Sequence, residues 1–134
     1  MAQYKTFKTM SEDDLNNSDT SQDIKIPKIS SLQHRKDLIQ QNLLVVIDNY
    51  TDWCGPCKQC SPQFAKIAIK YAKQGLCVLA KENVEDGFGE HPIPVRGVPC
   101  FHFYMNGQFL QDDIIVGTDI QSVENTIKRL LTNN

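Results

Sequence analysis

The chain has 134 residues, 40% of them hydrophobic and 22% charged, which is enough for one globular domain with an apolar core. Its formal net charge of -2 gives no electrostatic reason to expect nucleic acid or an anionic membrane as a partner. No apolar run approaches the roughly 20 residues that span a bilayer, and the first residues lack the apolar segment of a secretory signal. We therefore expect a cytoplasmic protein, with packaging in a virion as the alternative.

The chain divides into a polar beginning and a patterned remainder. Residues 1–25 are acidic in the middle and carry few apolar side chains to bury. We interpret them as a flexible extension, and the sequence leaves open whether they become ordered on a partner. Residues 26–134 show the apolar spacing of strands and helices and are interpreted as one domain.

The first half of this domain alternates strands and helices. A short strand is predicted at residues 26–29 and a helix at residues 32–41. The apolar run at residues 43–47 is typical of a strand that is covered on both faces. Apolar side chains recur at helical spacing over residues 57–74, and residues 76–84 predict another buried strand. Helical crossovers of this kind join parallel strands.

Prolines and glycines punctuate the middle of the chain. Pro62 lies inside the second predicted helix and is expected to kink it, because it lacks a backbone donor. Gly75 is expected to end that helix. Residues 85–97 include Gly87, Gly89, Pro92 and Pro94, which indicates a loop with room for one helical turn.

The C-terminal part predicts a hairpin and a helix. A strand at residues 101–105 leads to an Asn-Gly pair at 106–107, which is typical of a tight turn. The returning strand is expected at residues 109–116, with a bulge in its acidic middle. Residues 118–121 resemble a capping box before an amphipathic helix. The order of elements predicts an α/β fold with a mixed sheet and helices on both faces.

Two cysteines, Cys54 and Cys57, stand two residues apart where a predicted strand gives way to a helix. Such a pair can close and reopen a disulfide, and this placement is typical of thiol–disulfide exchange enzymes. In a reducing compartment a close pair is catalytic or metal-binding more often than structural. The chain has no Gly-rich dinucleotide fingerprint, so we expect it to bind no nicotinamide, flavin or other cofactor itself.

The stretch Trp-Cys-Gly-Pro-Cys-Lys at residues 53–58 resembles the active site of thioredoxins, and the resemblance runs from about residue 26 to the C-terminus. It implies a thioredoxin fold with a central five-stranded mixed sheet, and a protein-disulfide reductase. It also implies disulfide-containing protein substrates, a thioredoxin reductase or equivalent electron donor, and a monomer. Further positions match thioredoxins in order and approximate spacing: Asp48, Pro62, Lys81, Arg96, Gly97, Val98, Pro99, Gly107 and Gly117.

The resemblance gives these residues expected roles. Cys54 would be the nucleophile, with its pKa lowered by the helix that follows, and Cys57 the resolving thiol. Asp48, its pKa raised by burial and opposed by Lys81, would accept the proton of Cys57. The Val98–Pro99 bond is expected to be cis. A flat substrate-binding surface would combine five residues: Trp53, Gly97, Val98, Pro99 and Gly117.

Some residues depart from the thioredoxin pattern. Asn49 and Tyr50 stand where thioredoxins usually have Phe and Trp, and Asn49 is a polar residue without an evident role. Cys100 replaces the usual Thr after the proline and is interpreted as either a small buried thiol or a modulator of the redox pair. Cys60 lies one helical turn beyond Cys57 and is a second possible modulatory thiol.

Two other functions remain open on the sequence. One is an adaptor whose thiols are secondary; the acidic extension favours it slightly. The other is a metal site of Cys54, Cys57 and Cys60, which resembles an iron–sulfur run but lacks its fourth cysteine. We expect no metal. The remaining cysteine and the histidines are interpreted as core, surface or hydrogen-bonded residues: Cys77, His34, His91 and His102.

Overall fold

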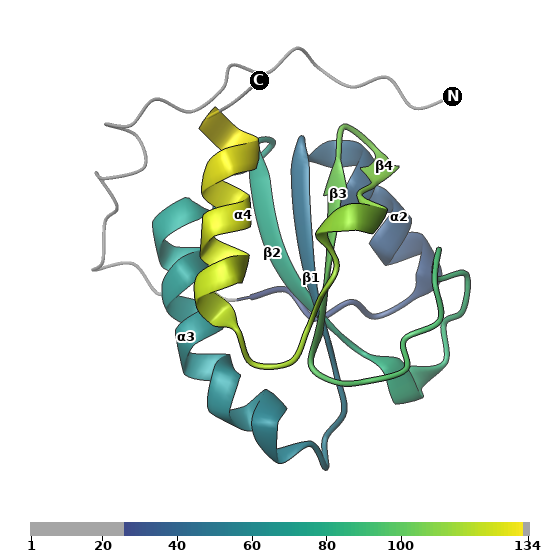
Figure 1. The fold of residues 1–134 in the computed structure, drawn as a ribbon. Helices are drawn as coiled ribbons and strands as arrows, with labels where there is room; N and C mark the ends of the chain where they lie inside the picture. The colour runs from purple at the N-terminus through teal and green to yellow at the C-terminus, as the bar shows by residue number, and fades with distance from the viewer. Residues whose placement is uncertain (1–25, 133–134) are drawn as a thin grey trace.

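The computed structural model describes residues 26–132, and the expected extension at residues 1–25 lies outside them. These residues form a five-stranded mixed sheet between two layers of helix (Figure 1). Strand β2 lies at one edge, followed by β1, β3 and β4, and the short β5 also pairs with β3. The strands are β1 (Leu44–Tyr50), β2 (Cys77–Asn83), β3 (Cys100–Met105), β4 (Gln108–Phe109) and β5 (Ile115–Val116).

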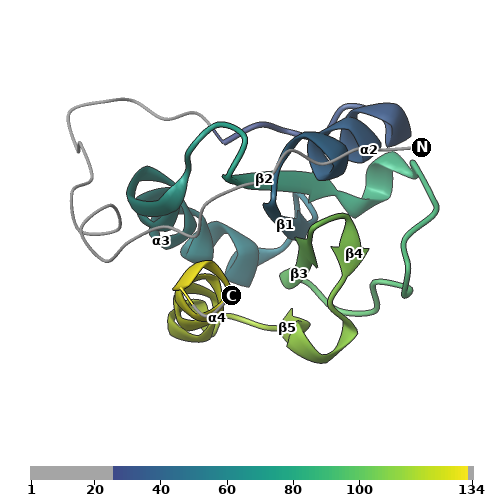
Figure 2. The ribbon, with the colours of Figure 1, turned by 90° about the horizontal axis from the view of Figure 1, so that it is seen from above.

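Helices cover both faces of the sheet, as predicted. Helix α2 (Leu32–Gln41) lies on one face, whereas α3 (Gly55–Tyr71) and α4 (Ile120–Thr132) lie on the other (Figure 2). Short 3₁₀ turns occur at Val84–Asp86 and Gln111–Asp113. Within the described residues, no helix is both long and apolar enough to cross a bilayer.

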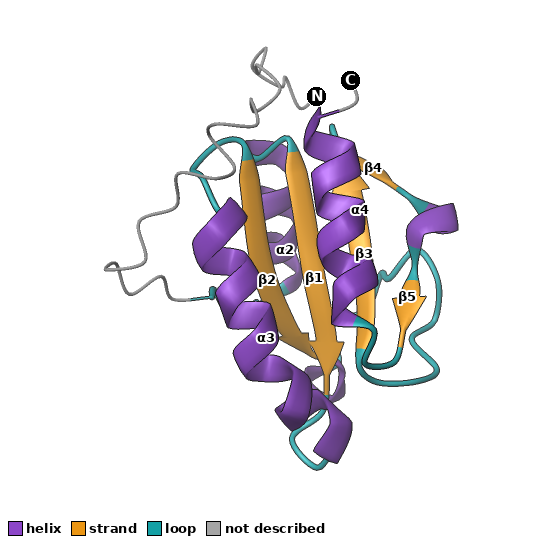
Figure 3. Ribbon diagram, turned by 60° about the vertical axis from the view of Figure 1, so that its left-hand side comes forward, coloured by secondary structure: helices purple, strands orange, loops and turns teal. Residues whose placement is uncertain are grey.

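The central strand β1 decides where the core lies, because it is buried on both faces. It pairs in parallel with β2 and antiparallel with β3. Leu44 and Val46 point into a large apolar cluster with α3 and α4, and Val45 and Ile47 point into a smaller one beneath α2. This is the environment that a continuous apolar run predicts. Figure 3 shows α3 and α4 crossing one face of the strands.

The strand predicted at residues 26–29 is wrong in extent. The structure has one parallel bridge there, between Lys28 and Lys81. Lys81 donates its N–H to the carbonyl of Pro27 at 2.9 Å, and Ile29 donates its N–H to the carbonyl of Lys81 at 2.8 Å. Pro27 has no N–H with which to continue the ladder toward the N-terminus.

The bounds of the helix that contains Cys57 also differ from the prediction. Helix α3 begins at Gly55, because Cys54 rather than a later residue caps it, and it ends at Tyr71. Ala72 is already extended, and Gly75, at φ +81°, lies in the turn between α3 and β2 rather than at the helix end. Pro62 lies inside the helix, as predicted.

The turn predicted for the C-terminal hairpin is confirmed, but the single returning strand is not. Asn106 and Gly107 both have positive φ, 55° and 83°, as a two-residue hairpin turn requires. The predicted strand over residues 109–116 is divided, because the 3₁₀ turn Gln111–Asp113 separates β4 from β5 where a bulge was expected. The cap of α4 is also different: the carboxylate of Asp119 accepts the Ser122 N–H at 3.1 Å.

Candidate active site

The two motif cysteines lie where β1 gives way to α3. The chain leaves β1 at Tyr50, and Cys54 occupies the N-cap position of α3. The Cys54 sulfur accepts the N–H of Cys57 at 3.1 Å, so the sulfur lies against the unpaired amides of the first helical turn. Pro56 fits this turn because its missing N–H would have had no helical partner.

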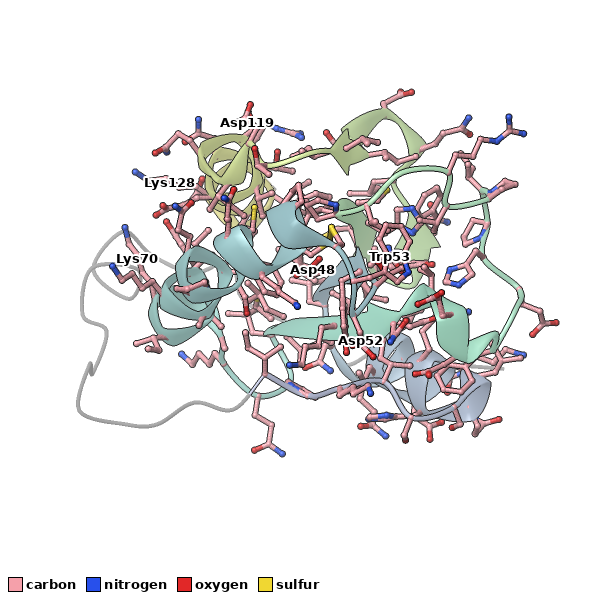
Figure 4. The ribbon with its side chains drawn as sticks, turned by 90° about the horizontal axis from the view of Figure 1, so that it is seen from below. Asp48, Asp52, Trp53, Lys70, Asp119 and Lys128 are labelled. Atoms are coloured by element: carbon pink, nitrogen blue, oxygen red, sulfur yellow. A yellow bond between two sulfur atoms is a disulfide. The ribbon has the colours of Figure 1, made fainter. Side chains whose placement is uncertain are left out.

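Cys54 and Cys57 form a disulfide, with their Cα atoms 5.3 Å apart. Cys54 is only 3% exposed and Cys57 only 5%. A nucleophilic Cys54 is expected to be open to solvent, with Cys57 lying deeper. This expectation is wrong for the oxidised state, in which both residues are almost fully buried. The neighbouring Trp53 is 71% exposed and flanks the disulfide (Figure 4).

The segment that leads into β3 lies against the disulfide. The Val98–Pro99 peptide bond is cis, as the resemblance implied, and the Val98 carbonyl oxygen lies 3.7 Å from the Cys54 sulfur. Gly117, at φ +102°, donates its N–H to the carbonyl of Pro99 at 2.8 Å. A Cβ on Gly97 would lie 3.3 Å from Cγ1 of Val116, so a side chain there is crowded.

The expected contact surface is only partly exposed. Of its five residues only Trp53 is exposed; Val116, which precedes Gly117 and was not predicted, is a second exposed apolar side chain. Gly97, Val98 and Gly117 are half-buried, and Pro99 is buried. An approaching chain would therefore meet the indole, the Val98 backbone and Val116 before it met the sulfur.

Asp48 lies on β1 beneath the start of α3 and is 5% exposed (Figure 4). Burial raises the pKa of its carboxyl to about 7, and the positive charge of Lys81, its register partner on β2, acts in the opposite direction. Its Oδ1 has no hydrogen-bond partner among residues 26–132. Asp48, Lys81 and Cys57 line one pocket of about 130 Å³, so the carboxyl of Asp48 and Cys57 share a space.

The three other cysteines are buried and stand outside the disulfide. Burial raises the pKa of the Cys60 and Cys100 thiols, and the charge of Asp48 raises both further. Burial alone raises the pKa of Cys77 to about 12, which fits a core residue. Across the part of the chain that the structure describes, no three His, Cys, Asp or Glu side chains are grouped to hold a metal ion.

The structure assigns a partner to Asn49, which the sequence left unexplained. Asn49 is fully buried opposite Cys100 in the β1–β3 register. Its Nδ2 donates to the Cys100 carbonyl at 3.0 Å, one residue after the cis bond. The Tyr50 ring has the Lys81 ammonium 5.9 Å from its centroid, so it packs as an aromatic beside the pocket.

Sequence reasoning missed a buried ionic cluster on the α2 face of the sheet. Arg35 donates from Nε and Nη2 to the two carboxylate oxygens of Glu82, at 2.7 and 2.8 Å. His91 Nε2 lies 3.1 Å from the same carboxylate. The one available signal was Glu82 itself, a charged residue within a strand predicted to be buried. His34 and His91 have hydrogen-bond partners, and His102 is buried in the same region.

A disulfide held at the first turn of a helix, above a buried acid and against a cis proline, defines a dithiol–disulfide oxidoreductase site. The thioredoxin family model matches residues 25–129, most of the chain. The thioredoxin of Coprinus comatus is 31% identical over 104 residues, which cover 77% of this chain and 95% of that protein. The chain therefore belongs to the thioredoxin family, whose members are protein-disulfide oxidoreductases.

Other similarities agree. Thioredoxin-like protein 1 of Schizosaccharomyces pombe is 36% identical over 106 residues, 75% of this chain, although the match spans only 34% of that relative. Oxidised mitochondrial thioredoxin 3 of Saccharomyces cerevisiae has a TM-score of 0.66 and 30% identity, covering 78% of this chain and 95% of that one. A second structure has 28% identity and a TM-score of 0.62, covering 79% of this chain and 96% of that one. It concerns the thiol resolving mechanism in yeast mitochondrial 1-Cys peroxiredoxin via glutathione/thioredoxin systems.

Proposed function

We propose that this protein reduces disulfide bonds of other proteins, with Cys54 as the attacking thiolate and Cys57 as the resolving thiol. The observation that carries the proposal is the Cys54 sulfur at the N-cap of α3, 3.1 Å from the N–H of Cys57. Unpaired helix amides and the positive end of the helix dipole favour a thiolate over a thiol at this position.

The reaction moves two electrons from the dithiol to the substrate. The Cys54 thiolate attacks one sulfur of the substrate disulfide, that S–S bond breaks, and the other substrate sulfur leaves as a thiolate and takes up a proton. Cys57 then loses its proton and attacks the Cys54 sulfur. The mixed disulfide breaks, the second substrate sulfur is released, and the Cys54–Cys57 disulfide forms.

Asp48 is the group proposed to accept the proton of Cys57. With a pKa of about 7 and a pocket shared with Cys57, its carboxyl can take up and return a proton near neutral pH. Lys81 keeps part of the population ionised by its charge. An apolar, partly dry setting slows the ionisation of a thiol, so a base beside Cys57 speeds the resolving step.

Substrate binding is proposed to use the backbone of Val98. Its carbonyl lies beside the Cys54 sulfur, and Val98 is half-buried and outside any strand. An extended substrate segment could pair with this backbone while its apolar side chains rest on Trp53. Peroxiredoxins are one class of substrate consistent with the similar structure described above. A reductase that draws on NADPH would restore the dithiol, and the protein would act as a monomer.

An insulin-reduction assay with dithiothreitol tests the proposal. We expect the folded, reduced protein to accelerate the precipitation of insulin chains well above the dithiothreitol background, and a Cys54→Ser/Cys57→Ser variant to match the background. A folded, reduced wild type with no activity would favour the adaptor function instead, in which the fold binds a partner and the thiols are secondary.

A further inference from the structure

The substrate-facing residues belong to a segment without regular structure. Residues 87–99 form neither helix nor strand, and they run from the end of the 3₁₀ turn after β2 to the start of β3, past α2 (Figure 1). Glu90 has a φ of +54°, an uncommon conformation for a residue with a side chain. The backbone groups of such a segment need partners outside a ladder, so something else must fix its path.

Arg35 of α2 supplies those partners near the beginning of the segment. Its guanidinium is buried, with 3% of the side chain exposed, and Nη1 donates to the carbonyls of Gly89 at 2.8 Å and Glu90 at 3.4 Å. The other edge of the guanidinium is fixed by its two hydrogen bonds to Glu82. A planar group held on one side this way presents its remaining donors in one direction.

The carboxylate that fixes Arg35 is itself fully enclosed. Burial alone would raise the pKa of Glu82, but hydrogen bonds and charges from His91 and Arg35 outweigh it and lower the pKa to about 2. Glu82 is therefore ionised at neutral pH. His91 follows Glu90 directly and lies 3.2 Å from Nη2 of Arg35, so three successive residues of the segment contact the cluster.

A different buried side chain holds the far end. Asn49 of β1 donates from Nδ2 to the Cys100 carbonyl, immediately after Pro99. Asn49 faces the same side of the sheet as Glu82, its register partner on β2. Arg35, which Glu82 of β2 fixes, and Asn49 of the neighbouring strand β1 thus flank the residues that face the substrate.

We propose that Arg35 and Asn49 are positioning residues that hold the two ends of residues 89–100, and so keep the Val98 backbone where a protein substrate can pair with it. The inference rests on the proposed function. A protein disulfide would use both the Cys54 thiolate and the Val98 backbone, whereas a small aromatic disulfide needs the thiolate alone. Loosening the anchors should therefore slow reaction with protein disulfides selectively.

The test compares two rate constants for each full-length, pre-reduced variant: one with excess insulin and one with excess 5,5′-dithiobis(2-nitrobenzoate). Asn49→Leu keeps the side-chain volume and removes the Nδ2 donor. It also removes the Oδ1 acceptor, which has no hydrogen-bond partner in the described chain, so the variant should fold. Arg35→Met/Glu82→Gln removes the second anchor and leaves neither charge buried alone. For each, we expect the insulin rate relative to the small-disulfide rate to fall about tenfold.

Glu124→Gln is the matched control. Glu124 accepts hydrogen bonds from Lys70 at 3.0 Å and Tyr71 at 2.7 Å, so the change loosens a half-buried polar cluster between α3 and α4 without contact to residues 89–100. Its ratio of rates should equal that of the wild type. The reduction potential should be unchanged in all three variants, because the anchors do not contact the disulfide.

A ratio within about twofold of wild type in folded Asn49→Leu or folded Arg35→Met/Glu82→Gln would overturn the role of that anchor. Equal slowing with both disulfides would also overturn it, since damage to the thiol pair affects both reactions. If the double variant does not fold, Asn49→Leu alone decides. A wild type that reduces neither disulfide contradicts the proposed function itself, before any variant is compared.

Discussion

Asp48 shows how one residue links the stability of this protein to its chemistry. An ionisable carboxyl with 5% exposure and an Oδ1 atom without a partner among residues 26–132 disfavours its own charged form. The positive charge of Lys81, the register partner of Asp48 on β2, offsets only part of the effect of burial, because the pKa of Asp48 still rises to about 7. The burial that suits Asp48 to its proposed role as a proton acceptor therefore costs the fold stability.

The pH dependence of unfolding tests this account. Between about pH 4 and pH 7 the folded Asp48 holds a proton that the unfolded chain has lost, so stability falls as the pH rises through this window. Asp48→Asn, which stays neutral, should be more stable than wild type by about 4 kcal/mol at pH 8, and equal to it below pH 4.

The measurement is urea unfolding of both oxidised proteins at pH 4, 6 and 8. A stability difference that stays constant over these values would contradict a raised pKa for Asp48. The same substitution should also slow the resolving step at pH 7, measured as the lifetime of a mixed disulfide on Cys54.

At the scale of elements, β3 carries different chemistry on its two faces. Phe101 and Phe103 pack toward α3 and α4, whereas His102 and Tyr104 alternate with them and lie near the charges of Arg35 and Glu82. Burial, together with the charges of nearby His91 and Arg35, lowers the pKa of His102 to about 4, while Glu82 acts in the opposite direction. The imidazole is therefore neutral in the folded protein at physiological pH.

This arrangement predicts a loss of stability in mild acid. The folded pKa of His102 lies below its ordinary value of 6.5. The stability that depends on a neutral His102 is therefore fully present above pH 6.5 and is lost as the pH falls toward 4. His102→Leu should remove this loss. Its stability relative to wild type should rise by about 3 kcal/mol between pH 7 and pH 4, measured by urea unfolding.

Phe109→Leu provides the comparison for His102. Phe109 stacks edge-on with the His102 ring, with centroids 5.1 Å apart, and does not titrate. Its effect on stability should be similar at pH 7 and pH 4. If His102→Leu shows no more pH dependence than Phe109→Leu, the acid sensitivity of the fold lies elsewhere.

Across the whole molecule, the sequence predicted the features that depend on residues close together in the chain. The motif at residues 53–58, the turn at 106–107 and the buried run of β1 were all predicted, since each depends on neighbours a few residues apart. Pro27 could have shown where the first strand fails, because a missing donor ends a ladder. The predicted bulge became a 3₁₀ turn, and no residue type distinguishes the two.

The polar face under α2 could not be predicted in the same way. Arg35 and Glu82 are 47 residues apart, and Arg35 and His91 are 56 apart, so their contact exists only after the sheet has formed. Asn49 likewise finds Cys100 across 51 residues. A buried charge in a strand indicates that a partner exists, but only the three-dimensional pairing of β1, β2 and β3 identifies it.

The most direct test of the central claim is to trap the intermediate between this protein and a substrate. Pre-reduced Cys57→Ser and Cys54→Ser proteins would each be mixed with insulin, quenched with an alkylating agent and analysed by mass spectrometry. Attack by Cys54 and resolution by Cys57 predict that Cys57→Ser accumulates an adduct on Cys54, whereas Cys54→Ser forms none. An adduct on Cys57 in Cys54→Ser, or no adduct in Cys57→Ser, would contradict the account.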